Sequence, residues 1–138
     1  METTPLLPEA PYLGSILPED YIRDQLSAAE ELHFTGHREP ALVAAGAGVE
    51  GALRLKARRA AGEEASAGAL LEALLAAGAI DELENELVFS VLCARDRLVH
   101  GFVPLQIHAA GPEVVLQVVG IALRLLEPAT VRELEFHQ

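Results

Sequence analysis

The sequence predicts an all-α fold, and three observations support that prediction. Apolar residues make up 51% of the chain, but aromatic residues make up only 4% and tryptophan is absent. The core must therefore consist mainly of leucine, valine and alanine, and leucine and alanine are strong helix formers. Runs of β-branched residues are few, whereas apolar residues recur at helical spacing. We expect an up-and-down bundle of about five helices, built from a single domain.

The expected bundle occupies residues 18–127, between a flexible N-terminal arm at 1–17 and a C-terminal tail at 128–138. The arm contains prolines and shows no helical period. Helices are expected at about 18–35, 40–59, 66–77, 81–100 and 113–126, and a short capped helix could follow at 130–136.

The first expected helix has a proline, Pro18, suited to its opening turn, and Gly36 marks its end. The fourth begins at a capping box, in which Asp81 is the N-cap residue and Glu84 the third helical residue. Helical spacing predicts the buried face of the first helix as Ile22, Leu26, Ala29 and His33. The apolar stripe of the fourth helix is predicted as Leu83, Leu87, Val91, Ala94 and Leu98, widened by Val88, Leu92 and Val99.

The second expected helix contains three interior glycines, Gly46, Gly48 and Gly51. A glycine costs about 1 kcal/mol in a helix interior, so we expect them to allow close approach of a neighbouring helix. Glu50 and Arg54 have the spacing of a simple salt bridge within this helix. Three basic residues near the helix end either bind phosphate or complement the helix dipole. They are Lys56, Arg58 and Arg59.

The fifth expected helix, 113–126, is apolar almost all round, so we expect it to lie at the centre of the bundle or at an interface. Its apolar run is too short to span a bilayer, and no signal peptide is recognisable. We therefore expect a soluble protein with no membrane partner. A single cysteine, Cys93, excludes an internal disulfide and fits the cytoplasm; with no CxxC pattern around it, we expect a buried structural thiol.

Cationic, acidic and imidazole side chains lie at close spacing beside a glycine at the end of the fourth helix. Asp96 and His100 are four residues apart, so the carboxylate can orient and charge the imidazole. Arg95 and His100 are five apart, which places them about 140° around the helix axis. They could act on one substrate only if the helix breaks near Val99, or if a second copy supplies its own motif. Alternatively, Asp96 and His100 are an ordinary helical pair, and Arg95 is a surface or capping cation.

The run from Arg95 to Gly101 resembles the arginine, polar residue, spacer and histidine signature of HEPN-domain proteins, a family of α-helical bundles. The likeness extends upstream, because 44–55 resembles the early helix of that family and 70–84 resembles the segment that leads into the motif helix. It covers about residues 18–127.

The resemblance implies one of two functions. Many HEPN proteins are metal-independent ribonucleases, often toxins paired with a nucleotidyltransferase-like antitoxin, while others are non-catalytic modules that dimerise or bind a protein or nucleotide. In the nucleases, the arginine and histidine of two protomers line one cleft. By resemblance, Arg95, Asp96 and His100 would be catalytic residues of a homodimer, and Arg97 would bind RNA. The chain departs from the family at Asp96, where asparagine is common, and a carboxylate there would weaken phosphate binding.

The chemistry of RNA cleavage without a metal independently favours a dimer. It needs a base, an acid and a cation beside the phosphate, and two motif copies supply two imidazoles. The net charge of −11, from 21 acidic and 10 basic residues, works against generic nucleic-acid binding, so we expect no DNA partner and only local positive potential for RNA. We expect no metal, because Gly36 interrupts the helix between His33 and His37 and no HExxH pattern is present. We expect no cofactor, because the sequence has no Walker or Rossmann motif. His108, in the loop after the motif, could line the cleft or simply be exposed.

Overall fold

The structure, a computed structural model, describes residues 17–61, 66–101 and 113–128, with only the backbone described at 58–61. These residues form helices and their connections, with no strand among them, so the predicted all-α class is confirmed. The predicted short helix at 130–136 and most of the predicted arm lie outside the described residues, as does His108. The helices are α2 (Glu19–Phe34), α3 (Arg38–Ala61), α4 (Ala67–Ala76), α5 (Glu82–Val99) and α7 (Val114–Leu126).

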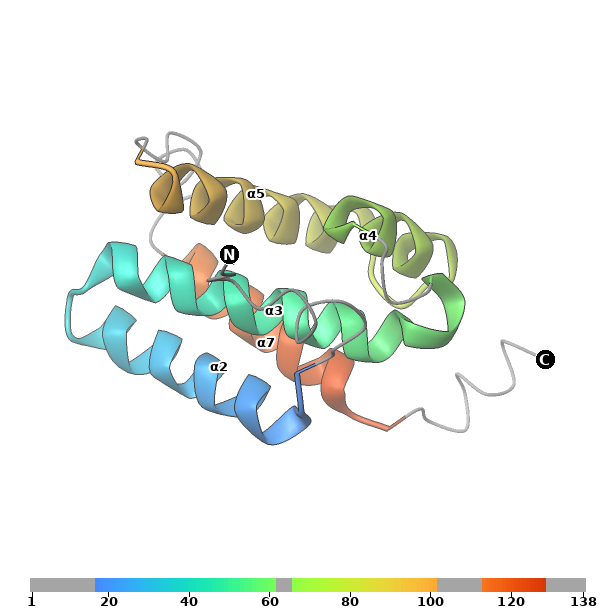
Figure 1. Cartoon of the computed structure of the whole chain (residues 1–138), viewed down its shortest axis with the longest axis horizontal. Coiled ribbons are helices and arrows are strands. Elements are labelled where there is room, and N and C mark those ends of the chain that lie inside the picture. The colour runs from blue at the N-terminus through green and yellow to red at the C-terminus, as the bar shows by residue number, and fades with distance from the viewer. Residues whose placement is uncertain (1–16, 62–65, 102–112, 129–138) are drawn as a thin grey trace, which may run out of the picture.

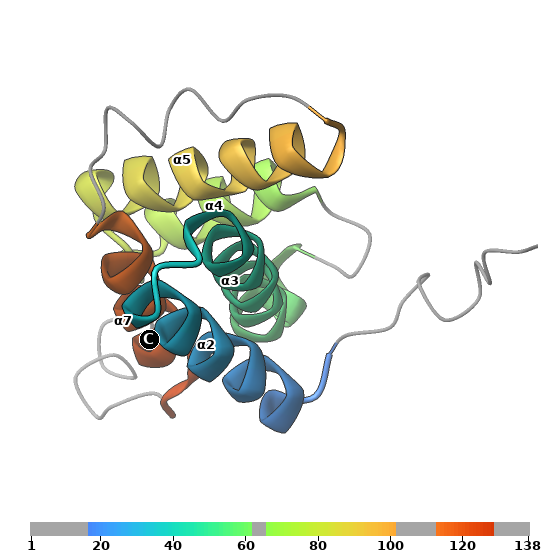
Figure 2. The ribbon, with the colours of Figure 1, turned by 90° about the vertical axis from the view of Figure 1, so that its left-hand side faces the viewer.

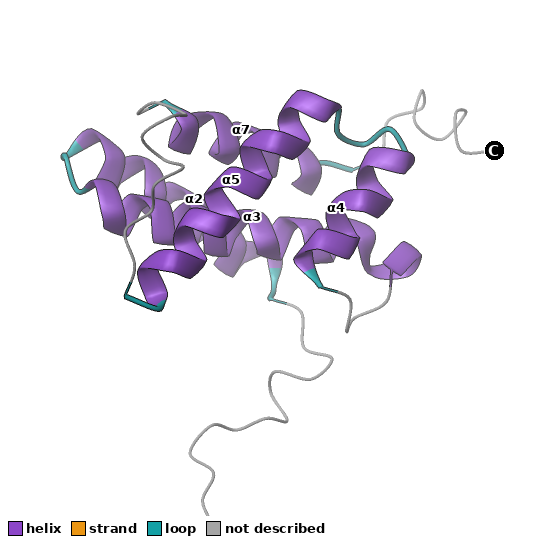
Figure 3. Cartoon of the chain, turned by 90° about the horizontal axis from the view of Figure 1, so that it is seen from above, coloured by secondary structure: helices purple, strands orange, loops and turns teal. Residues whose placement is uncertain are grey.

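Helix α3 lies at the centre of the bundle and contacts each of the other four described helices. In Figure 1, α4 and α5 run along the top, α2 runs along the bottom, and α7 passes behind α3. Figure 2 shows the same arrangement from one end, with α5 outermost on its side. Seen from above in Figure 3, α5 and α4 together cover the upper side. This placement gives α5 an inner face toward α3 and α7 and an outer face away from them.

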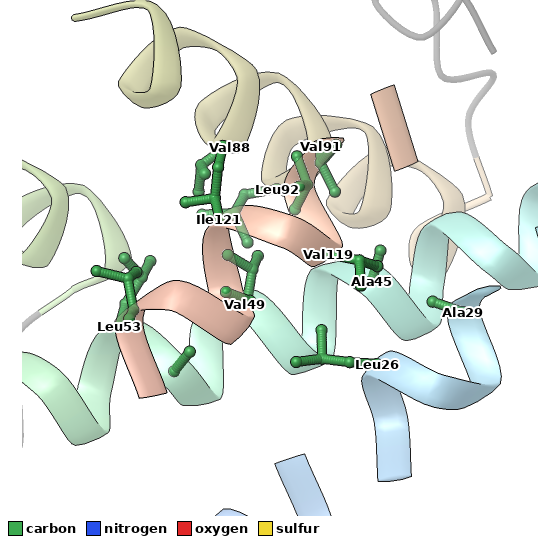
Figure 4. Close-up of a cluster of buried hydrophobic side chains, with 14 of the residues drawn as sticks. Leu26, Ala29, Ala45, Val49, Leu53, Val88, Val91, Leu92, Val119 and Ile121 are labelled. Atoms are coloured by element: carbon green, nitrogen blue, oxygen red, sulfur yellow. The ribbon is translucent and has the colours of Figure 1, made fainter. Parts of the chain in front are cut away.

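The core is aliphatic, as the composition predicts, and no polar or charged side chain is buried among the described residues. Figure 4 shows side chains of α3, α5 and α7 in one buried cluster, with Ile121 of α7 between Val88 of α5 and Val49 of α3. Helix α7 alone buries eight residues: Val114, Val115, Val118, Val119, Ile121, Ala122, Leu125 and Leu126. Packing within the chain thus accounts for these apolar residues, while Gln117, Gly120 and Arg124 form an exposed side, so α7 lies against α3 and not at the centre of the bundle.

The helix ends follow the predicted signals closely. The side chain of Asp81 accepts a hydrogen bond from the backbone N–H of Glu84 at 2.8 Å, and the Glu84 carboxylate accepts one from the N–H of Asp81 at 3.0 Å, which confirms the capping box. Gly101, with a φ of +87°, ends α5 in a left-handed turn that other residues rarely adopt. One detail was wrong: Pro18 is the N-cap residue of α2 and lies before its first turn.

The interior glycines of α3 allow close packing, as predicted. A Cβ atom added at Gly48 would lie 2.5 Å from Cδ2 of Leu26, and one at Gly51 would lie 2.8 Å from Cγ1 of Ile22. Both neighbours belong to α2, so these two glycines permit the α2–α3 crossing. Gly46 lies beside α5 instead, where its neighbour is the side chain of Arg95.

Candidate functional site

The inner face of α5 carries two buried valines between two charged residues. Val88 and Val91 are fully buried, and helical spacing places Glu84 and Arg95 on the same face, one toward each end. Glu84 forms an ion pair with Arg124 of α7. Arg95 therefore points toward the bundle, whereas the sequence alone allowed it to be a surface cation.

Arg95 lies between two carboxylates. Its Nη2 atom is 2.8 Å from Oε1 of Glu50 on α3 and 3.1 Å from Oδ1 of Asp96 on α5. Its Nε atom also donates to the same Asp96 oxygen at 3.3 Å. The Arg95 side chain is only 18% exposed. Gly46 leaves room for it, since a Cβ atom there would lie 2.8 Å from Cδ of Arg95.

Glu50 joins two arginines across the α3–α5 contact. Besides Arg95, it accepts hydrogen bonds from Nη2 of Arg54 at 2.7 Å and from Nε of Arg54 at 3.2 Å. Burial by itself would raise the pKa of Glu50, but hydrogen bonds and charge from Arg54 and Arg95 outweigh it, so this pKa lies below its ordinary value. The Glu50–Arg54 pair was predicted from its spacing. No spacing signal could identify Arg95 as the second partner, because the two residues lie on different helices.

The other predicted site residues lie elsewhere on α5. His100 is exposed and is the C-cap residue, and its backbone N–H donates to the carbonyl oxygen of Asp96 at 3.1 Å. Within the described part of the chain, no side-chain hydrogen bond joins Asp96 to His100, because the Asp96 carboxylate accepts from Arg95 instead. Arg97 is half-buried in the last turn.

Arg95 and His100 do not converge within one chain. Helix α5 is unbroken as far as Val99, so the helix break that could have brought them together does not occur before His100. They remain about 140° apart around the axis. Of the two routes that the sequence left open, only a second copy of the motif could place both residue types at one substrate.

The predicted apolar stripe of α5 was wrong at both ends. Leu83 is 65% exposed and Val99 is 59% exposed. Each lies eight residues from Val91, which rotates them about 80° to opposite sides of the inward direction. Near the two ends of α5, the inner face is occupied by the charged residues Glu84 and Arg95. The apolar stripe predicted from the sequence was therefore wider than the buried face.

Cys93 lies on α5 and is half-buried, so the expectation of a buried structural thiol holds only in part. Burial raises its pKa above the ordinary value, and the negative charge of Asp96 adds to this effect. A thiol with a raised pKa is a weak nucleophile at neutral pH. Its environment gives no support to a catalytic role.

A second polar contact ties α7 to the start of α5. Arg124 donates to the backbone carbonyl oxygen of Ala79 at 2.9 Å and to Oε1 of Glu84 at 3.0 Å. The hydrogen bond from Arg124 lowers the pKa of Glu84, burial opposes this, and the N–H of Asp81 adds a smaller lowering. Through these contacts Arg124 links α7 to the turn between α4 and α5 and to the capping box of α5. No pattern in the sequence predicts this pairing.

The remaining candidates carry little chemistry. Among the residues that the structure describes, no three histidine, cysteine, aspartate or glutamate side chains are grouped closely enough to hold a metal ion. The Thr35 hydroxyl lies 3.0 Å from Nδ1 of His37, at the turn between α2 and α3. Lys56, one of the three basic residues predicted at the end of α3, is half-buried. The side chains of the other two, Arg58 and Arg59, are not among those that the structure describes.

None of the described helices combines the length and apolarity needed to cross a membrane.

Comparisons of the chain with protein-family models, with curated proteins and with solved structures found no match in any of the three.

Proposed function

We propose that this chain is a non-catalytic helical interaction module of the HEPN type, the second of the two functions that the motif implies. The observation that carries this proposal is the position of Arg95 between the carboxylates of Glu50 and Asp96. An arginine that is largely covered and bound to two carboxylates serves first as a structural ion pair between helices.

The ribonuclease hypothesis requires a different state of Arg95. Arginine binds phosphate through the planar fork of its guanidinium group, with both N–H donors directed at the phosphate oxygens. Here Nη2 of Arg95 is 2.8 Å from Glu50 and 3.1 Å from Asp96. Phosphate binding would have to replace at least one of these contacts and bring an anion close to two carboxylates. The net charge of −11 adds to the cost of binding RNA.

A direct cleavage assay tests the proposal. Purified chain is incubated with a fluorogenic RNA in EDTA between about pH 6 and 8, the range in which a pair of imidazoles would act as acid and base. The matched controls are Arg95→Met and His100→Ala. We expect the wild-type chain to cut RNA no faster than either variant. Cleavage that persists in EDTA and is lost in both variants would contradict the proposal and establish the ribonuclease.

Asp96→Asn provides a second comparison. It removes the carboxylate that departs from the family pattern and leaves Arg95 paired with Glu50. On the proposed function this variant binds RNA no better than the wild-type chain, because the Glu50 carboxylate still engages Arg95. Tighter RNA binding by Asp96→Asn, measured by fluorescence anisotropy, would favour the ribonuclease instead. If the chain is a ribonuclease, we further predict that it acts in the cytoplasm and is paired with a nucleotidyltransferase-like antitoxin.

A further inference from the structure

One side of α3 is left open between α2 and α5. The interior glycines show where these two neighbours lie, because Gly48 and Gly51 lie against α2 whereas Gly46 lies against Arg95 of α5. Of the two sides of α3 between these contacts, one is buried where α7 passes behind it in Figure 1. The other side faces the viewer in that figure, and its residues, spaced four, three and four apart, are only half-buried. They are Val43, Ala47, Glu50 and Arg54.

The half of this open side that lies nearer the start of α3 is apolar. Val43 and Ala47 form it on α3. On α2 it is bordered by half-buried apolar residues that share a flank of the helix with Gln25, the residue that lies beside Gly48. They are Ala28 and Leu32. On α5 it is bordered by Val99, which follows Arg95 by four residues and is 59% exposed.

The chain enters this open side at its other end. Leu17 is the first described residue, and its Cδ1 atom lies 3.5 Å from the position that a Cβ atom at Gly51 would take. Gly51 and Val43 are eight residues apart on α3, which is roughly 12 Å along the helix. An extended segment of five residues spans roughly 16 Å. The five residues before Leu17 are therefore long enough to reach Val43.

The sequence of those five residues suits an apolar surface. Three of them are apolar, namely Tyr12, Leu13 and Ile16, and none is charged. An uncharged segment can cover apolar side chains without the cost of burying a charge. Pro11 precedes the segment and favours an extended backbone there.

We propose that residues 12–16 lie in extended form along the open side of α3, between α2 and α5, with Leu13 at the level of Val43. The segment is joined to the bundle at Leu17, so its effective concentration at this surface is high and weak apolar contacts are enough to hold it. A second copy or another protein would have to bind without that advantage. The inference holds whether or not the chain cuts RNA.

Thiol protection in the full chain tests the proposal. Cys93→Ser removes the native thiol, and Ala47→Cys places one on the open side of α3. We expect the thiol at position 47 to react with a disulfide reagent about threefold faster when Tyr12→Ser and Leu13→Ser are added, because the segment then no longer covers it. Leu6→Ser with Leu7→Ser is the matched control, which removes two apolar side chains outside the segment and should leave the rate unchanged. Equal rates for all three chains, or a faster reaction in the control, would overturn the proposal.

Concentration and disulfide mapping separate the segment from a second copy. The rate at position 47 should be the same at about 1 μM and at about 100 μM, since cover by the same chain does not depend on mass action. Protection that grows with concentration would mean that a second copy covers the surface. In the Cys93→Ser chain, Leu13→Cys with Val43→Cys should oxidise to a monomer that contains a 13–43 disulfide. Leu13→Cys with Ser27→Cys, which is exposed on the outer face of α2, is the control and should not. A 13–43 link between chains, or no link, would contradict the proposal.

Discussion

Arg95 of α5 and Glu50 of α3 form an ion pair between helices, with 2.8 Å between Nη2 and Oε1. Gly46 makes the pair possible, because it lets the arginine side chain lie close against α3. Arg54 binds the other carboxylate oxygen of the same glutamate, Oε2. The motif residue that the sequence presents as a candidate catalytic cation is therefore part of the contact between two helices.

The contact between Arg124 and Glu84 should contribute measurably to stability. Arg124→Ala removes hydrogen bonds to the Glu84 carboxylate and to the carbonyl oxygen of Ala79, so we expect a loss of about 1 kcal/mol in the free energy of unfolding. Arg23→Ala is the control, since both members of the Arg23–Glu19 pair are almost half exposed, and it should cost less than about 0.5 kcal/mol. Urea unfolding measures both, and equal losses would show that the α7 contact adds nothing.

The glycines of α3 and α7 should respond in opposite directions to a larger side chain. Gly48→Leu should destabilise the chain by about 1–3 kcal/mol, because Leu26 already occupies the space. Gly120→Ala should stabilise it by up to about 1 kcal/mol, since a Cβ there has no neighbour within 4 Å and alanine is the better helix former. Thermal unfolding monitored by circular dichroism checks both. A raised melting temperature for Gly48→Leu would mean that α2 and α3 do not pack closely.

Stability should fall in acid through Glu50 and Glu84. Both have a pKa below their ordinary value of 4.5 in the folded chain, so their contribution is present above that pH and is lost as pH falls through the folded pKa. The difference in unfolding free energy between the wild-type chain and Glu50→Gln should therefore shrink from about pH 6 to about pH 3. Urea unfolding across this range measures it, and a difference that stays constant would contradict the lowered pKa of Glu50.

Most of the fold could be predicted from the sequence because local signals specify it. The capping box at Asp81 and Glu84, the terminal Gly101, and the spacing of Ile22, Leu26 and Ala29 each depend on neighbours within a few residues. These signals act through hydrogen bonds and packing that recur in all helices.

The candidate site could be predicted only in part. The spacing of Asp96 and His100 allows a side-chain pair, but Asp96 binds Arg95 instead. The partner of Arg95 is Glu50, and the sequence carries no signal for a contact between residues on different helices. Val88 and Val91 pack against α3 and α7, and this packing decides which side of α5 faces inward. The exposure of Leu83 follows from that packing and could not be predicted from the sequence.

The thiol of Cys93 should react slowly while the chain is folded. Burial, and secondarily the charge of Asp96, raises its pKa, so less thiolate is present at neutral pH. Asp96→Asn should speed its reaction with a disulfide reagent by about twofold, and unfolding in urea should speed it further. Absorbance of the released thiolate at pH 8 follows the rate. A slower reaction in Asp96→Asn would show that the charge of Asp96 does not act on Cys93.

The coupling energy between Arg95 and Glu50 tests the structural role of the motif arginine most directly. It is measured as the free energy of unfolding in urea of the wild-type chain, Arg95→Met, Glu50→Gln and the double variant. Because the pair is largely covered, we expect a coupling of about 1–3 kcal/mol in favour of the pair, with Arg54 retaining part of the Glu50 interaction in Arg95→Met. A coupling near zero would show that Arg95 does not depend on Glu50, and would leave it available to bind phosphate.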